Sequence, residues 1–224
     1  MIEIRKIESR IELKAFVKFP FQLYRDNPYW VPPIIKEELE MLDKEVNPAF
    51  QNAIAHYFLA YKEGQIVGRI AAFINWIEVK ELKKNKVRFG WFDAVDDLQV
   101  TEKLMEQVIQ IGQQHQMTAV EGPMGFSNMD KAGMLIEGFE ELNTMITWYN
   151  APYYAQHFEK LGYTKQAEWI EFEIKISSFQ DSPEKVKRFS KLITDRYQLR
   201  ILNFHSHKEI LPYVDEMFDL LAKT

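Results

Sequence analysis

The sequence of 224 residues contains no cysteine, which excludes disulfide bonds and thiolate chemistry. It has no apolar run near the ~18–20 residues of a membrane-spanning helix, and its first residues lack a secretory apolar segment. Basic residues are outnumbered by acidic ones, and a net charge of -5 argues against a nucleic acid or an anionic membrane surface as the main partner. These absences predict a soluble, cytoplasmic protein with no nucleic-acid and no membrane partner.

Metal-ligand spacing is also missing. His56, His115 and His157 lie far apart in the sequence. His205 and His207 would face the same side of a strand, but no third ligand is evident near them. The sequence therefore predicts no metal site.

Apolar residues make up 46% of the chain, enough for a full hydrophobic core. The clearest pattern lies between residues 55 and 122, where Gly64 supplies the turn of a hairpin. The expected elements there are two hairpin strands, a third strand, an amphipathic helix and a short fourth strand, at 55–61, 66–74, 87–95, 98–115 and 118–121. This order predicts a mixed α/β layer.

Further elements are expected on both sides of this segment. Ser9 and Glu12 form a possible capping box that opens a helix, and Asn150 is expected as the N-cap of a helix that ends at Gly162. The remaining expected elements are strands at 1–7, 145–149, 167–176 and 199–204, and helices at 34–46, 134–140, 183–197 and 207–221.

The last part of the chain repeats the pattern of the first. Residues 199–206, followed by a helix, compare with residues 2–9, also followed by a helix. We therefore expect a first domain at 1–176, a linker at 177–183, and a tail at 184–224 that begins a second copy of the domain. On this hypothesis the chain is part of a longer two-domain protein.

Two short stretches resemble a known family. The second hairpin strand, Gln65-Ile66-Val67-Gly68-Arg69, and the FEKLGY segment at 158–163 are similar to segments of the GNAT-type N-acyltransferase superfamily, over roughly residues 1–176. The resemblance implies a mixed, mostly antiparallel central sheet flanked by helices on both faces. It also implies acetyl-CoA or another acyl-CoA as co-substrate and a small-molecule amine or a peptide as acceptor.

The resemblance further implies where the ligands would bind. The loop between the first two helices lines the acceptor pocket in that family, which points to Tyr29 and Trp30. The acyl-pantetheine chain enters where two central parallel strands splay apart. The cofactor-binding residues implied here are therefore Phe92, Asp93, Ala94, Val95, Gly122, Gly125 and Asn150.

Catalytic residues are less clearly marked. The family often uses the tyrosine of its FEKLGY-like segment to protonate the leaving thiolate, and that position is Phe158 here. Tyr154 lies one helical turn earlier and is the candidate acid, with core packing as its alternative role. Glu121, which ends the fourth strand, is the candidate general base.

The expected phosphate-binding turn departs from the family pattern. In place of glycines it carries Asp96 and Asp97, which would cap a helix and repel a diphosphate. Two functions therefore remain open. One is an N-acyltransferase with a divergent cofactor loop, and the alternative is a non-catalytic GNAT-fold module that forms half of a larger two-domain protein.

Overall fold

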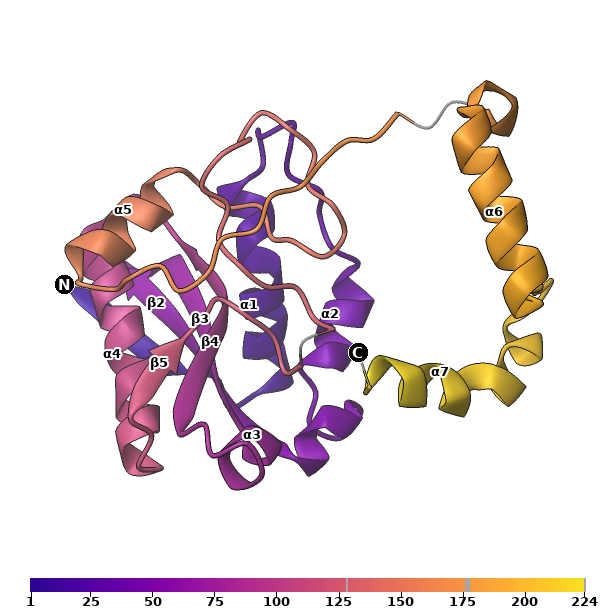
Figure 1. Cartoon of the computed structure of the whole chain (residues 1–224). Coiled ribbons are helices and arrows are strands. Elements are labelled where there is room, and N and C mark those ends of the chain that lie inside the picture. The colour runs from indigo at the N-terminus through magenta and orange to yellow at the C-terminus, as the bar shows by residue number, and fades with distance from the viewer. Residues whose placement is uncertain (128, 176–177, 224) are drawn as a thin grey trace. The chain divides into compact units, whose positions relative to one another are not determined.

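A computed structural model describes residues 1–127, 129–175 and 178–223. Of Phe179 it describes the backbone only. The chain divides into two compact units, Met1–Gln166 and Ala167–Thr224. Figure 1 shows the course of the chain through both units.

The first unit contains a sheet and five α-helices. Its strands are β1 (Ile2–Lys6), β2 (Ala53–Lys62), β3 (Gln65–Asn75), β4 (Lys86–Ala94) and β5 (Ala119–Glu121). Its helices are α1 (Arg10–Leu23), α2 (Ile35–Met41), α3 (Trp76–Lys80), α4 (Leu98–Gln114) and α5 (Tyr153–Lys160), with a 3-10 helix at Pro48–Gln51.

The strands lie in the order β1-β2-β3-β4-β5. The first four are antiparallel to their neighbours, and β5 is parallel to β4. Helices α1 and α2 cover one face of the sheet, while α4 and α5 cover the other (Figure 1). Each face has its own apolar core, one built around α4 and one around α1 and α2. The predicted fold class, a mixed and mostly antiparallel sheet flanked by helices on both faces, is confirmed.

Local sequence signals set the helix starts. The capping box at α1 is confirmed, because the Ser9 side chain accepts the Glu12 N–H and the Glu12 side chain accepts the Ser9 N–H. Asp97 is the N-cap of α4 and accepts the Gln99 N–H at 3.0 Å. Both caps satisfy N–H groups that a helix start leaves without a partner.

Helix α1 contains a proline, Pro20, in its interior. Because proline has no N–H, the carbonyl of Phe16, four residues earlier, loses its helical donor. The Nη1 atom of Arg69, on β3, donates to this carbonyl at 3.0 Å. A side chain of the sheet thus replaces the missing helical hydrogen bond.

Two predicted elements in the first unit are wrong. No helix forms at 134–140, where Gly138 has a φ of +78° and the side chain of Asn150 binds both the N–H and the C=O of Leu135. No strand forms at 145–149, where the chain turns and Met145 and Ile146 are exposed. Asn150 is also not an N-cap, since α5 begins after Pro152.

The second unit contains α6 (Glu184–Tyr197) and α7 (Val214–Leu221), with 3-10 turns at Phe179–Asp181, His207–Glu209 and Leu211–Tyr213. The strands predicted at 167–176 and 199–204 are absent from the described residues 167–175 and 199–204. Their alternating pattern suits a strand, but a strand forms only against a partner that takes its backbone hydrogen bonds. None of the described side chains of this unit is fully buried.

Candidate active site

The candidate site lies at the carboxyl end of β4. Strand β5 pairs with Lys86–Arg88, and among the described residues no strand pairs with the rest of that edge of β4. At the end of this edge, α5 supplies two tyrosines. The hydroxyl of Tyr154 accepts the Ala94 N–H at 2.8 Å, and the hydroxyl of Tyr153 donates to the Ala94 carbonyl at 2.7 Å.

A bulge in β4 directs the side chains at this end. Between the pairs Arg69↔Asp93 and Ala71↔Gly90 the register shifts by one residue, and Trp91 has a positive φ of 44°. As a result, Trp91 packs with the α1 core, whereas Phe92 and Ala94 pack with the α4 core. The extra residue turns the side chain of Asp93 toward α1.

Asp93 is the centre of a buried polar cluster. Its Oδ2 atom accepts from the Arg69 Nε at 2.7 Å, and both side chains are 8% exposed. Its Oδ1 atom accepts from the Tyr24 hydroxyl at 2.9 Å. The Tyr154 hydroxyl lies 2.9 Å from that of Tyr24 and 3.5 Å from Oδ1 of Asp93. A carboxylate, a guanidinium and two phenols thus meet beside the part of the β4 edge that β5 does not reach.

The surroundings keep both phenols protonated. Burial, followed by the negative charge of Asp93, raises the pKa of Tyr154 well above its usual value. The same two causes, in the same order, raise the pKa of Tyr24. Burial also raises the pKa of Tyr153 to about 12, with the charge of Asp96 next in importance. Tyr154 can therefore serve as a proton donor rather than a base near neutral pH.

The residues expected to line an acceptor pocket lie next to this cluster. The ring of Trp30 packs against that of Tyr24, with the ring centres 5.5 Å apart. The backbone N–H of Tyr29 donates to the side chain of Asn27, whose Nδ2 in turn donates to the Tyr149 hydroxyl at 2.6 Å. Both Tyr29 and Trp30 are partly exposed.

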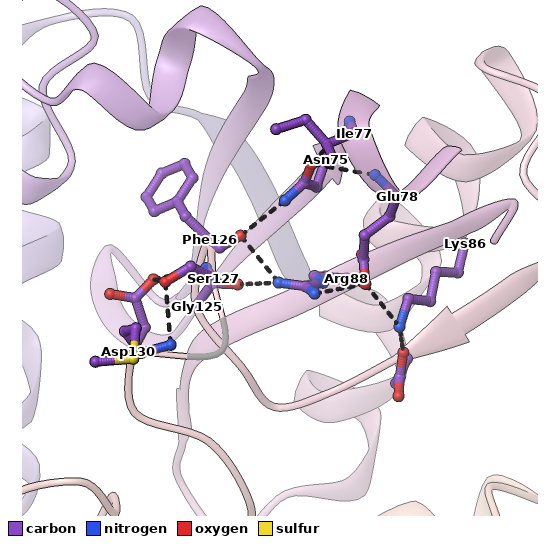
Figure 2. A network of polar contacts seen from close by, with 11 residues as sticks. Asn75, Ile77, Glu78, Lys86, Arg88, Gly125, Phe126, Ser127 and Asp130 are labelled. Carbon is purple, nitrogen blue, oxygen red and sulfur yellow. Dashed lines mark hydrogen bonds and ion pairs between the residues drawn. The ribbon is translucent and has the colours of Figure 1, made fainter. Parts of the chain in front are cut away.

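Glu121, the predicted base, belongs to a different network through Lys86, and Figure 2 shows Lys86, Glu78 and Arg88 of this network. It pairs with Lys86, which also lies 3.3 Å from Glu78. Glu78 pairs with Arg88 at 2.8 Å, and Arg88 donates to the carbonyls of Gly125 and Phe126 at 3.0 Å each. This network ties the loop after β5 to the beginning of β4.

The structure does not bring Glu121 and Tyr154 together. Glu121 pairs in register with Arg88, whereas Tyr154 binds Ala94, six positions further along β4. At about 3.3 Å per strand residue, the two positions are roughly 20 Å apart along the strand. They cannot act on the same reacting atom. Instead, Glu121 borders a pocket of about 360 Å³ that is also lined by Lys84, Thr118 and Gln166.

The carboxylate of Glu78 makes stability sensitive to acid. Burial raises its pKa, but the hydrogen bond from Arg88 and the positive charges of Arg88 and Lys86 outweigh burial and lower the pKa. Because the folded-state pKa lies below the unfolded one, this stabilisation is present above the unfolded pKa and is lost as the pH falls through the folded pKa.

We therefore expect the free energy of unfolding of the wild type to approach that of Glu78→Gln between about pH 5 and about pH 3. Urea denaturation of both proteins at several pH values measures this difference. A difference that stays constant over the whole range would contradict the prediction.

Gly122 and Gly125, which were predicted to bind the cofactor, lie where two segments of the chain come very close to each other. A Cβ at Gly122 would lie 2.3 Å from the carbonyl oxygen of Phe89, and one at Gly125 would lie 2.3 Å from Cβ of Asp130. The Met124 N–H also donates to the Phe89 carbonyl, at 2.8 Å. The loop after β5 therefore covers the middle of the β4 edge and leaves the Ala94 end to the tyrosines.

The two carboxylates of the turn before α4, Asp96 and Asp97, both bind neighbouring groups of the protein. Asp97 caps the helix and pairs with Lys62 at 2.8 Å. The side chain of Asp96 contacts Nε2 of His157 at 3.0 Å, and Nδ1 of His157 lies 2.8 Å from Oγ1 of Thr101. The predicted capping role is confirmed for Asp97, while Asp96 links the turn to α5.

The remaining predicted residues have structural partners. The ring of Phe92 packs against Tyr154 and Phe158, and Phe158 stacks on Phe89. The Val95 N–H donates to the Val67 carbonyl at 2.9 Å, which continues the pairing of β4 with β3. Phe158, at the position of the family's tyrosine, is therefore a core residue.

Sequence reasoning missed Tyr24 and Arg69 as members of the site. Tyr24 follows the last residue of α1, and Arg69 was seen only as part of a strand motif. No local pattern relates them to Asp93, because the contacts join residues that are 69 and 24 positions apart. An arginine inside an apolar strand was the one available signal, since a buried charge requires a partner.

Comparison with known proteins identified two curated relatives. Protein YghO of Escherichia coli (strain K12) is 31% identical over 216 residues, which are 96% of this chain and 55% of that protein. The bacterial ceramide synthase of Caulobacter vibrioides (strain NA1000 / CB15N) is 27% identical over 188 residues, or 84% of this chain and 48% of that protein. The chain spans about half the length of both.

No known family profile matches the sequence. Among solved structures, a predicted acetyltransferase of Clostridium acetobutylicum with acetyl-CoA has a TM-score of 0.46 and 13% identity, over 77% of this chain and 96% of that one. The mixed, mostly antiparallel sheet described above is the one that the superfamily resemblance implies. The fold is GNAT-like.

Two features are absent from the described residues. None of the helices in this part of the chain is both long and apolar enough to cross a bilayer. In the same residues, no three His, Cys, Asp or Glu side chains are grouped so that they could hold a metal ion.

Proposed function

We propose that the protein is an N-acyltransferase that moves an acyl group from a thioester, acyl-CoA in the first instance, to a primary amine. The observation that carries the proposal is the position of the Tyr154 hydroxyl and the Asp93 carboxylate, 3.5 Å apart at the end of β4 that β5 does not reach. An acid and a base side by side are what aminolysis of a thioester requires.

In the proposed reaction the amine nitrogen attacks the thioester carbonyl carbon, and a new C–N bond replaces the C–S bond. The thiolate leaves with the electron pair of the C–S bond and takes the proton of Tyr154. The Asp93 carboxylate accepts the surplus proton of the amine nitrogen. The donor lies beside the backbone of Ala94 and Val95, where Tyr154 keeps its hydrogen bond from the Ala94 N–H.

The proposed acceptor is a long-chain amino alcohol. One relative is a ceramide synthase, and a ceramide is the amide of a fatty acid with such an amine. The loop beside the cluster is also suited to an aliphatic chain, because Val31 and Ile34 are 60% and 61% exposed and Tyr29 and Trp30 lie next to them. Apolar surface of this kind favours a substrate with apolar chains.

The test is amide formation by the full natural chain, followed by mass spectrometry. Palmitoyl-CoA is offered with sphinganine, and in parallel with ethanolamine, which has the same amino alcohol end without the long chain. We expect the amide of sphinganine, with ethanolamine a much poorer acceptor. No amide from either amine would overturn the proposed activity, and equal rates with both would overturn the proposed acceptor.

The donor has its own test, because the Asp97 carboxylate occupies the helix end that would otherwise attract a diphosphate. If this turn contributes nothing to donor binding, palmitoyl-pantetheine should be used about as well as palmitoyl-CoA. A strong preference for palmitoyl-CoA would mean that the turn rearranges around the diphosphate.

The alternative is a non-catalytic GNAT-fold module, and the filled Ala94 edge and the Asp97 cap favour it. A ligand at about 100 times its dissociation constant stabilises a protein by about 2.7 kcal/mol. The module function would be supported if saturating acyl-CoA produced no rise in Tm and the assay above yielded no amide.

We also propose that residues 184–224 begin a second GNAT-like copy. Both relatives are about twice the length of this chain, and every described side chain of this part is at least partly exposed. Apolar faces without a core need a further surface to cover them. Strong hydrogen-exchange protection of α6 in the full natural chain is the expected result, and rapid exchange there would contradict it.

A further inference from the structure

Tyr24 occupies an unusual place for a residue at the end of a helix. It is 5% exposed, and its hydroxyl lies 2.9 Å from both the Tyr154 hydroxyl and Oδ1 of Asp93. Tyr24 comes from the α1 side of the sheet and Tyr154 from α5 on the other side. The two phenols meet beside Ala94, the last residue of β4, on a part of the strand edge that β5 does not reach.

The hydrogen bonds of the cluster have one consistent direction. A carboxylate can only accept, so the single proton of Tyr24 points to Asp93. Tyr154 already accepts the Ala94 N–H, and its own proton therefore points to the oxygen of Tyr24. The result is a chain of donors that runs from Tyr154 to Tyr24 to Asp93.

We propose that Tyr24 is a positioning residue for the acid step: it holds the Tyr154 hydroxyl at the end of β4 and stabilises the phenolate left after Tyr154 gives up its proton. This inference rests on the proposed N-acyl transfer. It assigns to Tyr24 a role that no sequence motif indicates.

The path of the protons in the proposed reaction supports this role of Tyr24. When the proton of Tyr154 passes to the thiolate sulfur, the phenolate oxygen keeps the Ala94 N–H as one donor. Tyr24 becomes the second donor when it turns its proton from Asp93 to the phenolate. Asp93 has meanwhile accepted the proton of the amine nitrogen, and this proton passes through Tyr24 to restore Tyr154. The net change is one proton moved from nitrogen to sulfur.

The need for such help follows from the site itself. Burial and the charge of Asp93 oppose a phenolate at Tyr154, and the hydrogen bonds from Tyr24 and Ala94 are the contacts that favour it. Without the hydroxyl of Tyr24, the phenolate keeps only the Ala94 N–H as a hydrogen-bond donor. Proton donation by Tyr154 then becomes slower.

The test compares three variants on two donors. The variants are Tyr24→Phe, Tyr154→Phe and a matched control, Tyr57→Phe, which removes a phenol that donates to the Leu42 carbonyl at 2.9 Å on the α1 side of the sheet. The donors are palmitoyl-CoA and the thiophenol ester of palmitic acid. Thiophenol is more acidic than an alkyl thiol and needs less help from an acid to leave.

We expect Tyr24→Phe to lower kcat with palmitoyl-CoA by about 10- to 150-fold, the usual range for a lost hydrogen bond to a charged group. The KM for the amine should change little. With the thiophenol ester most of the lost rate should return in both Tyr24→Phe and Tyr154→Phe. Tyr57→Phe should resemble the wild type on both donors, with thermal unfolding confirming that all variants are folded.

Two results would overturn the inference alone. One is an active wild type with a Tyr24→Phe variant no slower than Tyr57→Phe. The other is an equal loss with both donors, which indicates general damage to the site. A wild type that makes no amide from either donor would overturn the proposed function together with this inference.

Discussion

Replacing Tyr154 with phenylalanine is expected to lower kcat for amide formation from palmitoyl-CoA by about 10²- to 10⁴-fold, the usual contribution of a general acid. The ring stays in its place against Phe92, so the α4 core keeps its packing. The lost hydroxyl leaves the Ala94 N–H without its acceptor, which costs about 1–3 kcal/mol of stability. Steady-state kinetics and thermal unfolding measure the two effects separately.

The neighbouring tyrosine provides the control. Tyr153→Phe removes a hydrogen bond to the carbonyl of the same residue, Ala94, and leaves the buried cluster untouched. We expect this variant to keep kcat within a few-fold of the wild type. If the two variants lose activity equally, Tyr154 is needed for the position of α5 and not for its proton.

Removing the guanidinium of Arg69 should have the largest effect on stability. In Arg69→Met, the Asp93 carboxylate stays 8% exposed without its cation, and the Phe16 carbonyl loses its donor. Breaking a buried ion pair in this way costs about 3–5 kcal/mol, because the remaining buried charge has lost its counter-ion. Urea denaturation at neutral pH should show a correspondingly lower midpoint.

Arg5 offers a matched comparison on the surface. Its Nε atom lies 2.7 Å from Glu3, the same distance as in the Arg69–Asp93 pair, but both side chains are more than half exposed. Water and salt screen such a pair, so Arg5→Met should leave the urea midpoint almost unchanged. Equal losses in the two variants would mean that burial of the Asp93 pair does not determine its strength.

The sheet could be predicted from the sequence where its pattern is local. The hairpin strands β2 and β3 are apolar runs on either side of a turn, and the helix α4 repeats its apolar residues at the period of a helix. Each was placed to within a few residues. The strand predicted at 167–176 has an alternation of apolar and polar residues that is also typical of a strand. Its pattern alone could not show whether another strand lies beside it, and the described residues 167–175 form none.

The site could be predicted only in part. Tyr154 and Asp93 were both named, but as an acid and as a backbone contact, and Glu121 was expected to share the acid's site. Their true arrangement depends on the bulge at Trp91, which exchanges the two faces of β4. One inserted residue in a strand leaves no mark on composition or period, so Asp93 could not be assigned to its face.

The proline inside α1 fixes how that helix can lie on the sheet. The free carbonyl of Phe16 is the only acceptor that Pro20 creates, and Arg69 reaches it from β3. If α1 slid along the sheet by one turn, about 5.4 Å, the guanidinium would face carbonyls already engaged by the helix. Pro20 therefore fixes the position of α1 along the sheet. This position in turn determines how deeply the side chain of Tyr24 is buried.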